Sequence, residues 1–420
     1  MVNSSLYNKV LSMARKNPLF YKGVNINGGI LNYYYDVFEG INTTHGLSYF
    51  RLLVHFLKMP DLRLFFQSIQ ENRCVFTYQN ARKDYLELID LARIGISSAS
   101  VPLNVTNYGF SLKSLYCTLN LYFNIKFHSY YFRMKEKIFL FSLIYHYIFV
   151  INRLLFILDN KSVVLRKYIP FNSSYRIENI ITQVLNIKGV NTYHLCHGLH
   201  FVQFKNFYPV DYLNQFNVSA QYILAWGDCF LQNNSEKYVF EVVGNPKYPY
   251  KKIRVKNSFL HCIVFLSRPI YEEGNMKLLN ILAEIKAEKP IFNFAVKPHP
   301  NSMNLNFIEQ FCQDKKMEYL NKDVTISSIL QSGRFDFSIS YQTNVYFEAM
   351  YYNLPCFRYI YQENEDWGDY DDRFLEKEDL LNQIDKIRNK DREQLSKELE
   401  RILVTSLGMG INRYKEVINL

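Results

Sequence analysis

The sequence lacks several patterns that would place it in a common protein class. Its seven cysteines are scattered and include no Cys-x-x-Cys pair, so no disulfide framework is indicated. It has no zinc-finger spacing, no RNP aromatic motif and no basic helix, so nothing in it is typical of nucleic-acid binding. It has no internal repeat, and its first 20 residues lack an apolar core. We therefore expect reduced thiols, a cytoplasmic protein without a signal peptide, and no nucleic-acid partner.

The composition is that of a globular chain with two domains. The 420 residues are 48% hydrophobic and 21% charged, enough for two cores of ordinary size. The net charge is +10, which a protein that handles anionic nucleotides beside anionic lipid would explain simply. Aromatic residues reach 16%, either from an A/T-rich coding bias or from a membrane-facing aromatic and basic surface.

Apolar runs alternate with amphipathic stretches from residue 73 onward, which predicts parallel sheets covered by helices. We expect strands over 73–78, 162–165, 190–196, 222–226, 239–243, 261–266, 292–296, 318–320, 335–339 and 356–359, and helices over 84–92, 175–187, 276–288, 305–314, 326–331 and 346–352. The basic segment 247–257 interrupts the series, so we expect an N-terminal Rossmann-like domain over 1–250 and a second over 251–420 with a C-terminal helix. Before residue 73, Asn27-Gly28-Gly29 indicates a turn, and 47–66 has helical spacing.

The segment 138–158 is apolar enough to span a membrane by its length. Asn152 and Arg153 would lie inside such a span at a high cost in free energy. A buried or interfacial helix is therefore the favoured interpretation, with His146 as a core residue. Contact of this segment with lipid stays open.

Polar groups gather after two predicted strands of the second domain. One strand ends at Lys297-Pro298-His299-Pro300, and the other runs into Ser340-Tyr341-Gln342-Thr343-Asn344, with Glu348 on the helix that follows. In an open parallel sheet, ligands bind at the carboxyl ends of the strands. Cations, hydroxyls and helix amides suit a phosphate there, and a carboxylate suits ribose hydroxyls. Ser267 and Arg268 end a neighbouring strand, where Arg268 could pair with a phosphate or a sugar carboxylate.

This ordered set, over about residues 190–360, resembles the donor-binding domain of GT-B glycosyltransferases that build bacterial capsule and lipopolysaccharide. The resemblance implies two Rossmann-like domains facing an interdomain cleft and a nucleotide-sugar donor. It also implies that His299 stabilises the leaving phosphate and that Glu348 contacts the ribose, with Lys297, Pro300, Ser340, Thr343, Asn344, Ser267 and Arg268 also at the donor site. Enzymes of this fold generally need no bound metal, and no Asp-x-Asp motif stands in the right context here, so we expect neither metal nor other cofactor.

In the first domain, His197-Gly198 follows a strand, and Asn245 follows another. His197 resembles the His of the His-Gly element in glycerophosphotransferases and could act as a general base on an acceptor hydroxyl. Gly198 and Asn245 are candidates for the acceptor side. His194, His197 and His200 lie close in sequence, but no set of carboxylates completes a metal site.

The sequence therefore predicts an inverting GT-B glycosyltransferase that transfers sugar to a capsule or lipopolysaccharide glycan, with association at the inner-membrane surface. A CMP-activated acidic sugar, sialic acid or Kdo-like, is the expected donor, because the Lys-Pro-His-Pro and Ser/Thr groups suit one phosphate. Three alternatives stay open. They are a CDP-glycerol-type glycerophosphotransferase, a non-catalytic nucleotide- or glycan-binding partner and, ranked last for want of a Ser-Gly-Gly turn, a UDP-sugar epimerase. The acidic segment 363–372 is expected to be a solvated loop.

Overall fold

The computed structural model describes residues 4–38, 48–125, 132–198, 217–233, 238–300, 302, 304–361 and 371–419. The helices in this part are α1 (Ser4–Lys16), α2 (Asn27–Phe38), α3 (Tyr49–Leu57), α4 (Arg63–Glu71), α5 (Lys83–Ala92), α6 (Leu112–Phe123), α7 (Met134–Asn160), α8 (Arg176–Ile187), α10 (Glu272–Glu288), α11 (Leu305–Asp314), α12 (Ile326–Gln331), α13 (Val345–Tyr351), α14 (Lys377–Asn389), α15 (Arg392–Leu407) and α16 (Tyr414–Asn419), with 3-10 turns η1 (Asp228–Asn233) and η2 (Pro269–Tyr271). The strands are β1 (Phe20–Tyr21), β2 (Val24–Asn25), β3 (Lys58–Pro60), β4 (Cys74–Tyr78), β5 (Ala99–Pro102), β6 (Thr106–Tyr108), β7 (Lys167–Pro170), β8 (Asn191–Leu195), β9 (Tyr222–Ala225), β10 (Val239–Val242), β11 (His261–Phe265), β12 (Asn293–Lys297), β13 (Glu318–Tyr319), β14 (Phe337–Ser340), β15 (Cys356–Tyr359) and β16 (Arg373–Phe374).

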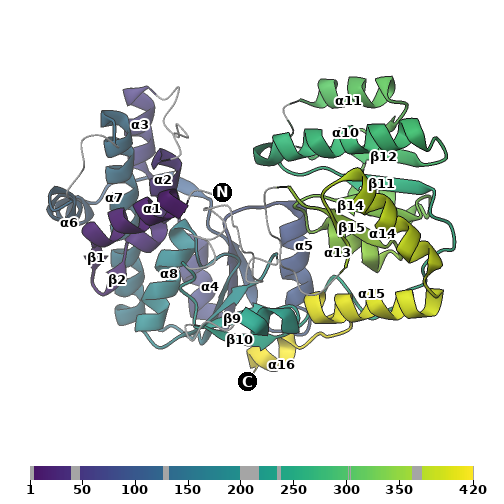
Figure 1. Ribbon diagram of the computed structural model, residues 1–420. Helices are drawn as coiled ribbons and strands as arrows, with labels where there is room; N and C mark the ends of the chain where they lie inside the picture. The colour runs from purple at the N-terminus through teal and green to yellow at the C-terminus, as the bar shows by residue number, and fades with distance from the viewer. Residues whose placement is uncertain are drawn as a thin grey trace.

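Two six-stranded parallel sheets organise the chain (Figure 1). The first has the order β10-β9-β8-β7-β4-β5 and the second the order β13-β12-β11-β14-β15-β16. Numbered by their own first strands, the orders read 6-5-4-3-1-2 and 3-2-1-4-5-6, both of the doubly wound type. Each order reverses at one point, between β4 and β7 in the first sheet and between β11 and β14 in the second. The predicted fold, two Rossmann-like domains in the GT-B arrangement, is confirmed.

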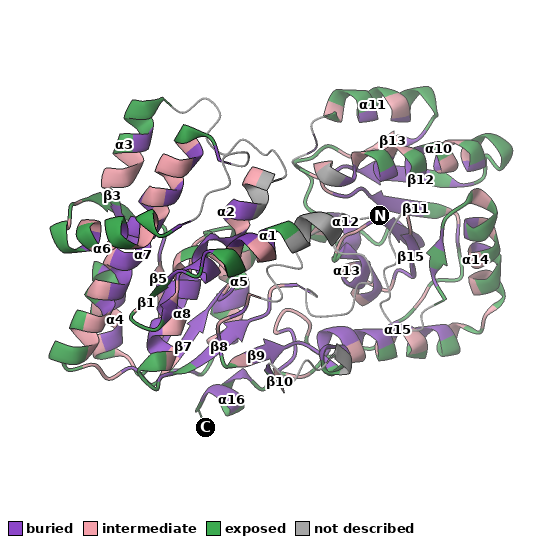
Figure 2. Ribbon diagram, turned by 60° about the vertical axis from the view of Figure 1, so that its left-hand side comes forward, coloured by how far each residue is buried: buried purple, intermediate pink, exposed green. Residues whose placement is uncertain are grey.

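Apolar packing joins the two domains as well as filling each one. One cluster of buried side chains includes Phe76 and Leu224 from the first sheet together with Ile263 and Phe347 from the second domain. A second cluster lies between the first sheet and helices α1, α2, α7 and α8, and a third lies around α10 and the second sheet. Figure 2 shows the buried residues running through the strands of both sheets. The domains therefore share part of their core.

The chain crosses back to the first domain after α15, and backbone meets backbone at this crossing. Gly408 ends α15 with φ +61°, and a Cβ there would stand 2.1 Å from the Trp226 carbonyl oxygen. A Cβ on Gly244 would stand 2.0 Å from the Ile411 oxygen. The Asn245 amide donates to Leu407 at 2.7 Å, and α16 then packs its apolar face into the shared core. Side chains would separate these segments, so glycine is required here.

Helix α7 is 27 residues long, and by length and hydropathy alone it could cross a membrane. In the fold, 56% of its most apolar 18-residue stretch is buried. Asn152 accepts hydrogen bonds from Tyr21 at 2.8 Å and Lys22 at 3.0 Å. His146 is buried at 3.2 Å from the Phe56 carbonyl, and burial lowers its pKa to about 4. The structure thus shows a helix packed in the domain, with His146 in the core as predicted.

Two sequence predictions are wrong in this domain. The expected strand over 162–165 has no regular structure, because its neighbour β7 carries the pairing with β4. Asn27-Gly28-Gly29 opens α2 instead of forming a turn. The two glycines serve close packing, since a Cβ on Gly28 would meet Asn179 at 2.3 Å and one on Gly29 would meet Tyr147 at 2.7 Å. The helical spacing over 47–66 is confirmed, because the described part from residue 48 onward holds α3 and the start of α4, with the short β3 between them.

The crossing can be tested by replacing Gly408 with alanine. We expect Gly408→Ala to lower the free energy of unfolding by about 3 kcal/mol, because a strained φ adds to an overpacked contact. Gly333→Ala is the matched control, since its φ is +64° but nothing lies within 4 Å of the new Cβ. It should cost about 1 kcal/mol. Urea unfolding of both variants measures the difference, and equal losses would show that the close approach has no energetic weight.

Candidate active site

The reversal point of the second sheet is tied together by Ser267, which follows β11. Its main-chain N–H and C=O bond the side-chain amide of Asn275 on α10, at 2.8 and 3.1 Å. Its hydroxyl donates to the Gln342 carbonyl, 3.2 Å away, after β14. The ends of β11 and β14 are thereby held in register where the strand order reverses. In doubly wound sheets this is where ligands bind.

The turn after β14 differs from the prediction. Ser340 is the last residue of β14 and is buried, so it does not cap the next helix. Gln342 has φ +48°, and this turn delays the start of α13 to Val345, with Asn344 at the N-cap. Thr343 caps weakly, accepting from the Val345 amide at 3.4 Å. In this turn Gln342 and Thr343 are half-buried and Asn344 is exposed, while phosphate contact by Ser340, Thr343 or Asn344 stays a prediction.

Lys297 ends β12 and is buried, and its ammonium group already has two partners. It donates to the carbonyl oxygens of Asn321 and Lys322, both at 2.8 Å. These bonds fasten the loop after β13 to the sheet edge. The structure therefore gives Lys297 a structural role, and its predicted contact with phosphate has no support from this geometry.

His299, two residues further along the chain, belongs to a cationic group that spans both domains. Burial lowers its pKa, and the charges of Arg268 and Arg82 lower it further. Arg268 follows β11 in the second domain, whereas Arg82 precedes α5 in the first. His299 is thus neutral at neutral pH, with two guanidinium groups near it. Pro300 follows it directly and limits the backbone freedom of this loop.

Tyr85 on α5 connects this group to His197. The Arg82 guanidinium lies over the Tyr85 ring at 4.2 Å, and Arg268 acts electrostatically on the Tyr85 hydroxyl. The ring of His197 lies 5.8 Å from Tyr85 and stacks on Phe171 at 4.5 Å. The structure therefore brings the predicted His197 and His299 to the same junction between the two domains. Tyr85 links them, because it lies near the His197 ring and near the two arginines that act on His299. Figure 1 shows α5 lying between the first sheet and the second domain.

Glu348 on α13 faces helix α5 of the first domain. Burial raises its pKa, Lys247 opposes this and the carboxylates of Asp84 and Glu87 add to it, so that the pKa is about 7. Lys247 is itself bound to α5, since its ammonium donates to the Asp84 carbonyl at 2.9 Å and to Glu87 at 2.8 Å. Among the described residues, no side chain or amide donates to the Glu348 carboxylate. An acceptor of this kind suits ligand hydroxyls.

The remaining predicted residues lie around these groups. Gly198 follows His197 at the end of the first sheet. Asn245 is buried and accepts from the Lys247 amide at 3.1 Å, so it shapes the turn that carries Lys247 across to α5. His194 is buried and bonded to Ser173 at 3.0 Å, which makes it a structural residue. His200 lies outside the described residues, and within the described part no group of three metal-ligating side chains occurs.

Sequence reasoning missed Arg82, Tyr85 and Glu178. Glu178 lies in the first turn of α8. It accepts from the Thr77 hydroxyl of β4 and from the Phe171 amide after β7, both at 3.0 Å, and these are the two strands at the reversal point of the first sheet. It thereby holds Phe171, on which His197 stacks. A signal was present for Arg82 and Tyr85, because both follow the predicted strand 73–78 at the edge where ligands bind. No sequence signal separated Glu178 from the other acids of amphipathic helices.

The acidic segment 363–372 lies mostly outside the described residues. Asp372 is described and buried, and it binds Arg358 at 2.6 Å instead of facing solvent as predicted. Asp371 accepts from Gln383 at 3.0 Å. The end of this segment is therefore bound to the second domain.

No family model and no curated protein matches the chain. Solved structures of similar fold include UDP-GlcNAc 2-epimerase from Neisseria meningitidis bound to UDP-GlcNAc, at 12% identity and a TM-score of 0.48 over 82% of this chain and 98% of that one. The S. aureus MnaA–UDP structure matches at 12% identity and a TM-score of 0.48, over 83% and 97%. TarM matches at 14% identity and a TM-score of 0.40, over 66% and 58%. At these sequence identities the similarity concerns the fold alone. The two sheets of this chain themselves define the GT-B arrangement.

Glu178 should make folding stability depend on pH. Burial raises its pKa from the usual 4.5 to about 7, so the folded state binds this proton more tightly than the unfolded state. The resulting stabilisation is complete below pH 4.5 and is lost as the pH rises through 7, by at most about 3 kcal/mol. In Glu178→Gln the free energy of unfolding should fall less between pH 5 and pH 8 than in the wild type. Chemical unfolding at several pH values measures this, with the exposed Glu309→Gln as control. Parallel curves for Glu178→Gln and the wild type would contradict it.

Proposed function

We propose that the protein is a glycosyltransferase that uses a nucleotide-sugar donor. The observation that carries the proposal is the group at the domain junction, where His299 and Arg268 of the second domain face Arg82 and Tyr85 of the first, and Glu348 lies near the acids of α5. Guanidinium groups suit phosphate oxygens, and a carboxylate acceptor suits ribose hydroxyls. The donor would bind at the reversal point of the second sheet, next to Ser267.

The proposed chemistry is a direct displacement. The acceptor hydroxyl oxygen bonds to the anomeric carbon, the bond from that carbon to the phosphate oxygen breaks, and the electron pair leaves with the nucleotide. His197 takes the acceptor proton. Its Nδ1 lies 3.4 Å from the Leu195 carbonyl, which can only accept, so Nδ1 carries the proton in this contact and Nε2 holds the lone pair. His299 and Arg268 stabilise the leaving phosphate.

The charges of the site are compatible with more than one donor nucleotide. Arg82 and Arg268 supply two positive charges. A CMP-activated acidic sugar carries one phosphate charge and one carboxylate charge, whereas a UDP-sugar carries two phosphate charges, so both fit. We propose the CMP-activated acidic sugar, as the sequence predicts, and a capsule or lipopolysaccharide glycan as acceptor. No metal or other cofactor enters this proposal. The seven cysteines are free and six are buried, which supports a cytoplasmic location.

A nucleotide panel tests the donor site. We expect a thermal shift with CMP, or with UDP if the donor is a diphosphate sugar, while CDP, GDP and UMP give smaller shifts. His299→Ala should lose this shift and at least about a hundredfold of turnover, because the leaving phosphate loses a donor. His261→Ala, at the opposite end of β11, is the matched control and should keep both. Nucleotide binding without turnover on any glycan would favour a non-catalytic partner, and full turnover in His299→Ala would reject the assigned role.

Nucleotide affinity should also depend on pH through Glu348. Its pKa is about 7, and only the ionised carboxylate accepts from both ribose hydroxyls, so affinity should rise about tenfold from pH 6 to pH 8. Glu348→Gln should bind more weakly at pH 8 and lose most of this dependence. Isothermal titration of both proteins with the same nucleotide measures it. Titration of the nucleotide itself is common to both, so an identical pH profile would contradict a role for Glu348 in ribose binding.

A further inference from the structure

Helix α6 packs Cys117, Leu121 and Tyr122 partly against the domain core and exposes a separate row of apolar side chains. Ser114 and Thr118, four residues apart, are buried against the domain, while Leu112, Tyr116 and Phe123 are 74%, 67% and 80% exposed. Leu119 completes the exposed row, at spacings of four, three and four residues that place all of these apolar side chains on one face. A helix in a soluble domain normally turns its apolar stripe toward the core. The outward stripe indicates a partner that receives it.

Helix α3 carries a second exposed apolar face next to the first. Tyr49, Phe50 and Leu53 are exposed, with Phe50 at 72%. Two contacts hold α3 and α6 on the same side of α7. Phe56 of α3 lies 4.5 Å from Tyr145 of α7 and 6.5 Å from Phe110, which precedes α6. We call the exposed sides of α3 and α6 the α3/α6 surface.

The charge on this surface has one sign. The sequence contains no Asp or Glu between Glu39 and Asp61, and none between Asp90 and Glu136. Glu136 is buried and accepts from the Arg133 amide at 2.6 Å, and Asp61 pairs with Arg63 at 2.7 Å, so neither acid opposes the cations of this surface.

The exposed basic side chains of this region are Arg51, Lys58, Lys113 and Arg133. The Lys135 ammonium also lies 5.5 Å from the Tyr49 ring. Aromatic and aliphatic side chains interleaved with cations match the boundary between acyl chains and anionic headgroups.

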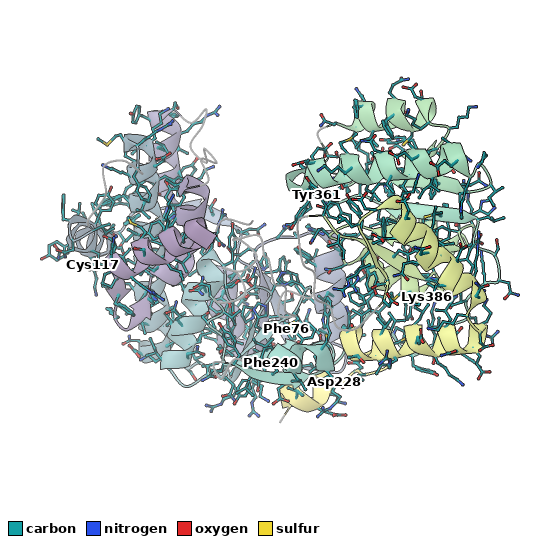
Figure 3. The ribbon with its side chains drawn as sticks, in the orientation of Figure 1. Phe76, Cys117, Asp228, Phe240, Tyr361 and Lys386 are labelled. Carbon is teal, nitrogen blue, oxygen red and sulfur yellow. The ribbon has the colours of Figure 1, made fainter. Side chains whose placement is uncertain are left out.

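We infer that the α3/α6 surface docks the protein on an anionic phospholipid bilayer. Leu112, Tyr116 and Phe123 enter the headgroup boundary, and the flanking cations pair with lipid phosphates. A second copy of the chain fits less well, because two basic surfaces repel each other. Figure 3 places Cys117 of α6 at the far side of the first domain from Tyr361 of the second, so docking leaves the domain junction uncovered.

Vesicle co-sedimentation of the full chain tests this inference without reference to turnover. The vesicles are phosphatidylcholine alone, and phosphatidylcholine with phosphatidylglycerol at about 7:3. We expect binding to the mixed vesicles, weakened by salt, and at least tenfold weaker partition for Tyr116→Ser/Phe123→Ser. The matched control is Ile291→Ser/Phe307→Ser, which removes two equally exposed apolar side chains of the second domain and should bind as the wild type does. Lys113→Ala should weaken binding about fivefold.

Three results would overturn the inference. They are no sedimentation of the wild type with mixed vesicles, equal binding to neutral vesicles, and unchanged binding of the double variant. Analytical ultracentrifugation without lipid tests the alternative that the α3/α6 surface binds a second copy of the chain. A wild-type dimer that Tyr116→Ser/Phe123→Ser converts to a monomer would assign the surface to a second copy of the chain. Because both substitutions are at exposed positions, an unchanged melting temperature should show that the variant is folded.

Discussion

The arrangement of the two domains depends on the backbone contact that the chain makes as it returns from α15 to α16. Gly408 and Gly244 let this segment lie against the end of the first sheet without side chains between them, and the Asn245 amide fixes it to Leu407 at 2.7 Å. The rest of the junction is held by side-chain contacts, namely apolar packing and long side chains such as Lys247. The positions of Arg82 and Tyr85 relative to Arg268 and His299 therefore depend on a contact in which no catalytic group takes part. A hinge between the domains would have to move around this crossing.

Burial at the junction sets the protonation of the proposed site before any ligand arrives. Burial and the two arginines lower the pKa of His299, whereas burial and the acids of α5 raise that of Glu348. Near pH 7 His299 is then neutral and Glu348 is about half ionised, while the guanidinium groups stay charged. An anionic ligand would reverse the balance at His299, since a nearby negative charge favours the imidazolium form. In the proposed donor complex, the bound phosphate would therefore bring its own proton donor into the charged state.

The sequence was sufficient for most of the strand series and for the edge at which polar groups gather, because period, length and turn residues are local properties. It missed β5 and β16 at the edges of the two sheets. Nine of its ten predicted strands exist, and β7 replaces the tenth a few residues later. The structural partners of Lys297, the carbonyls of Asn321 and Lys322, could not be foreseen because they come from a loop more than 20 residues away. Gly28 and Gly29 were predicted to form a turn because the sequence does not show why glycine is needed there. That need comes from tertiary contacts with α8 and α7. Glu178 needed the sheet order, which no local pattern contains, whereas Arg82 and Tyr85 were overlooked although both follow the predicted strand 73–78.

Helix α6 shows the limit of hydrophobic periodicity in a different way. The period gives the apolar face of a helix correctly, but whether that face is inward depends on what it meets. Here Ser114 and Thr118 are turned inward, and Thr118 satisfies its hydroxyl on the Ser114 carbonyl at 2.7 Å. The domain gains partial apolar burial from Cys117, Leu121 and Tyr122 of α6, while the exposed row leaves apolar area whose burial against another surface would be favourable. If that surface is a bilayer, α7 takes part from within the fold, as the rigid support behind α3 and α6. The apolar run that resembles a membrane span would then serve membrane contact without entering the lipid.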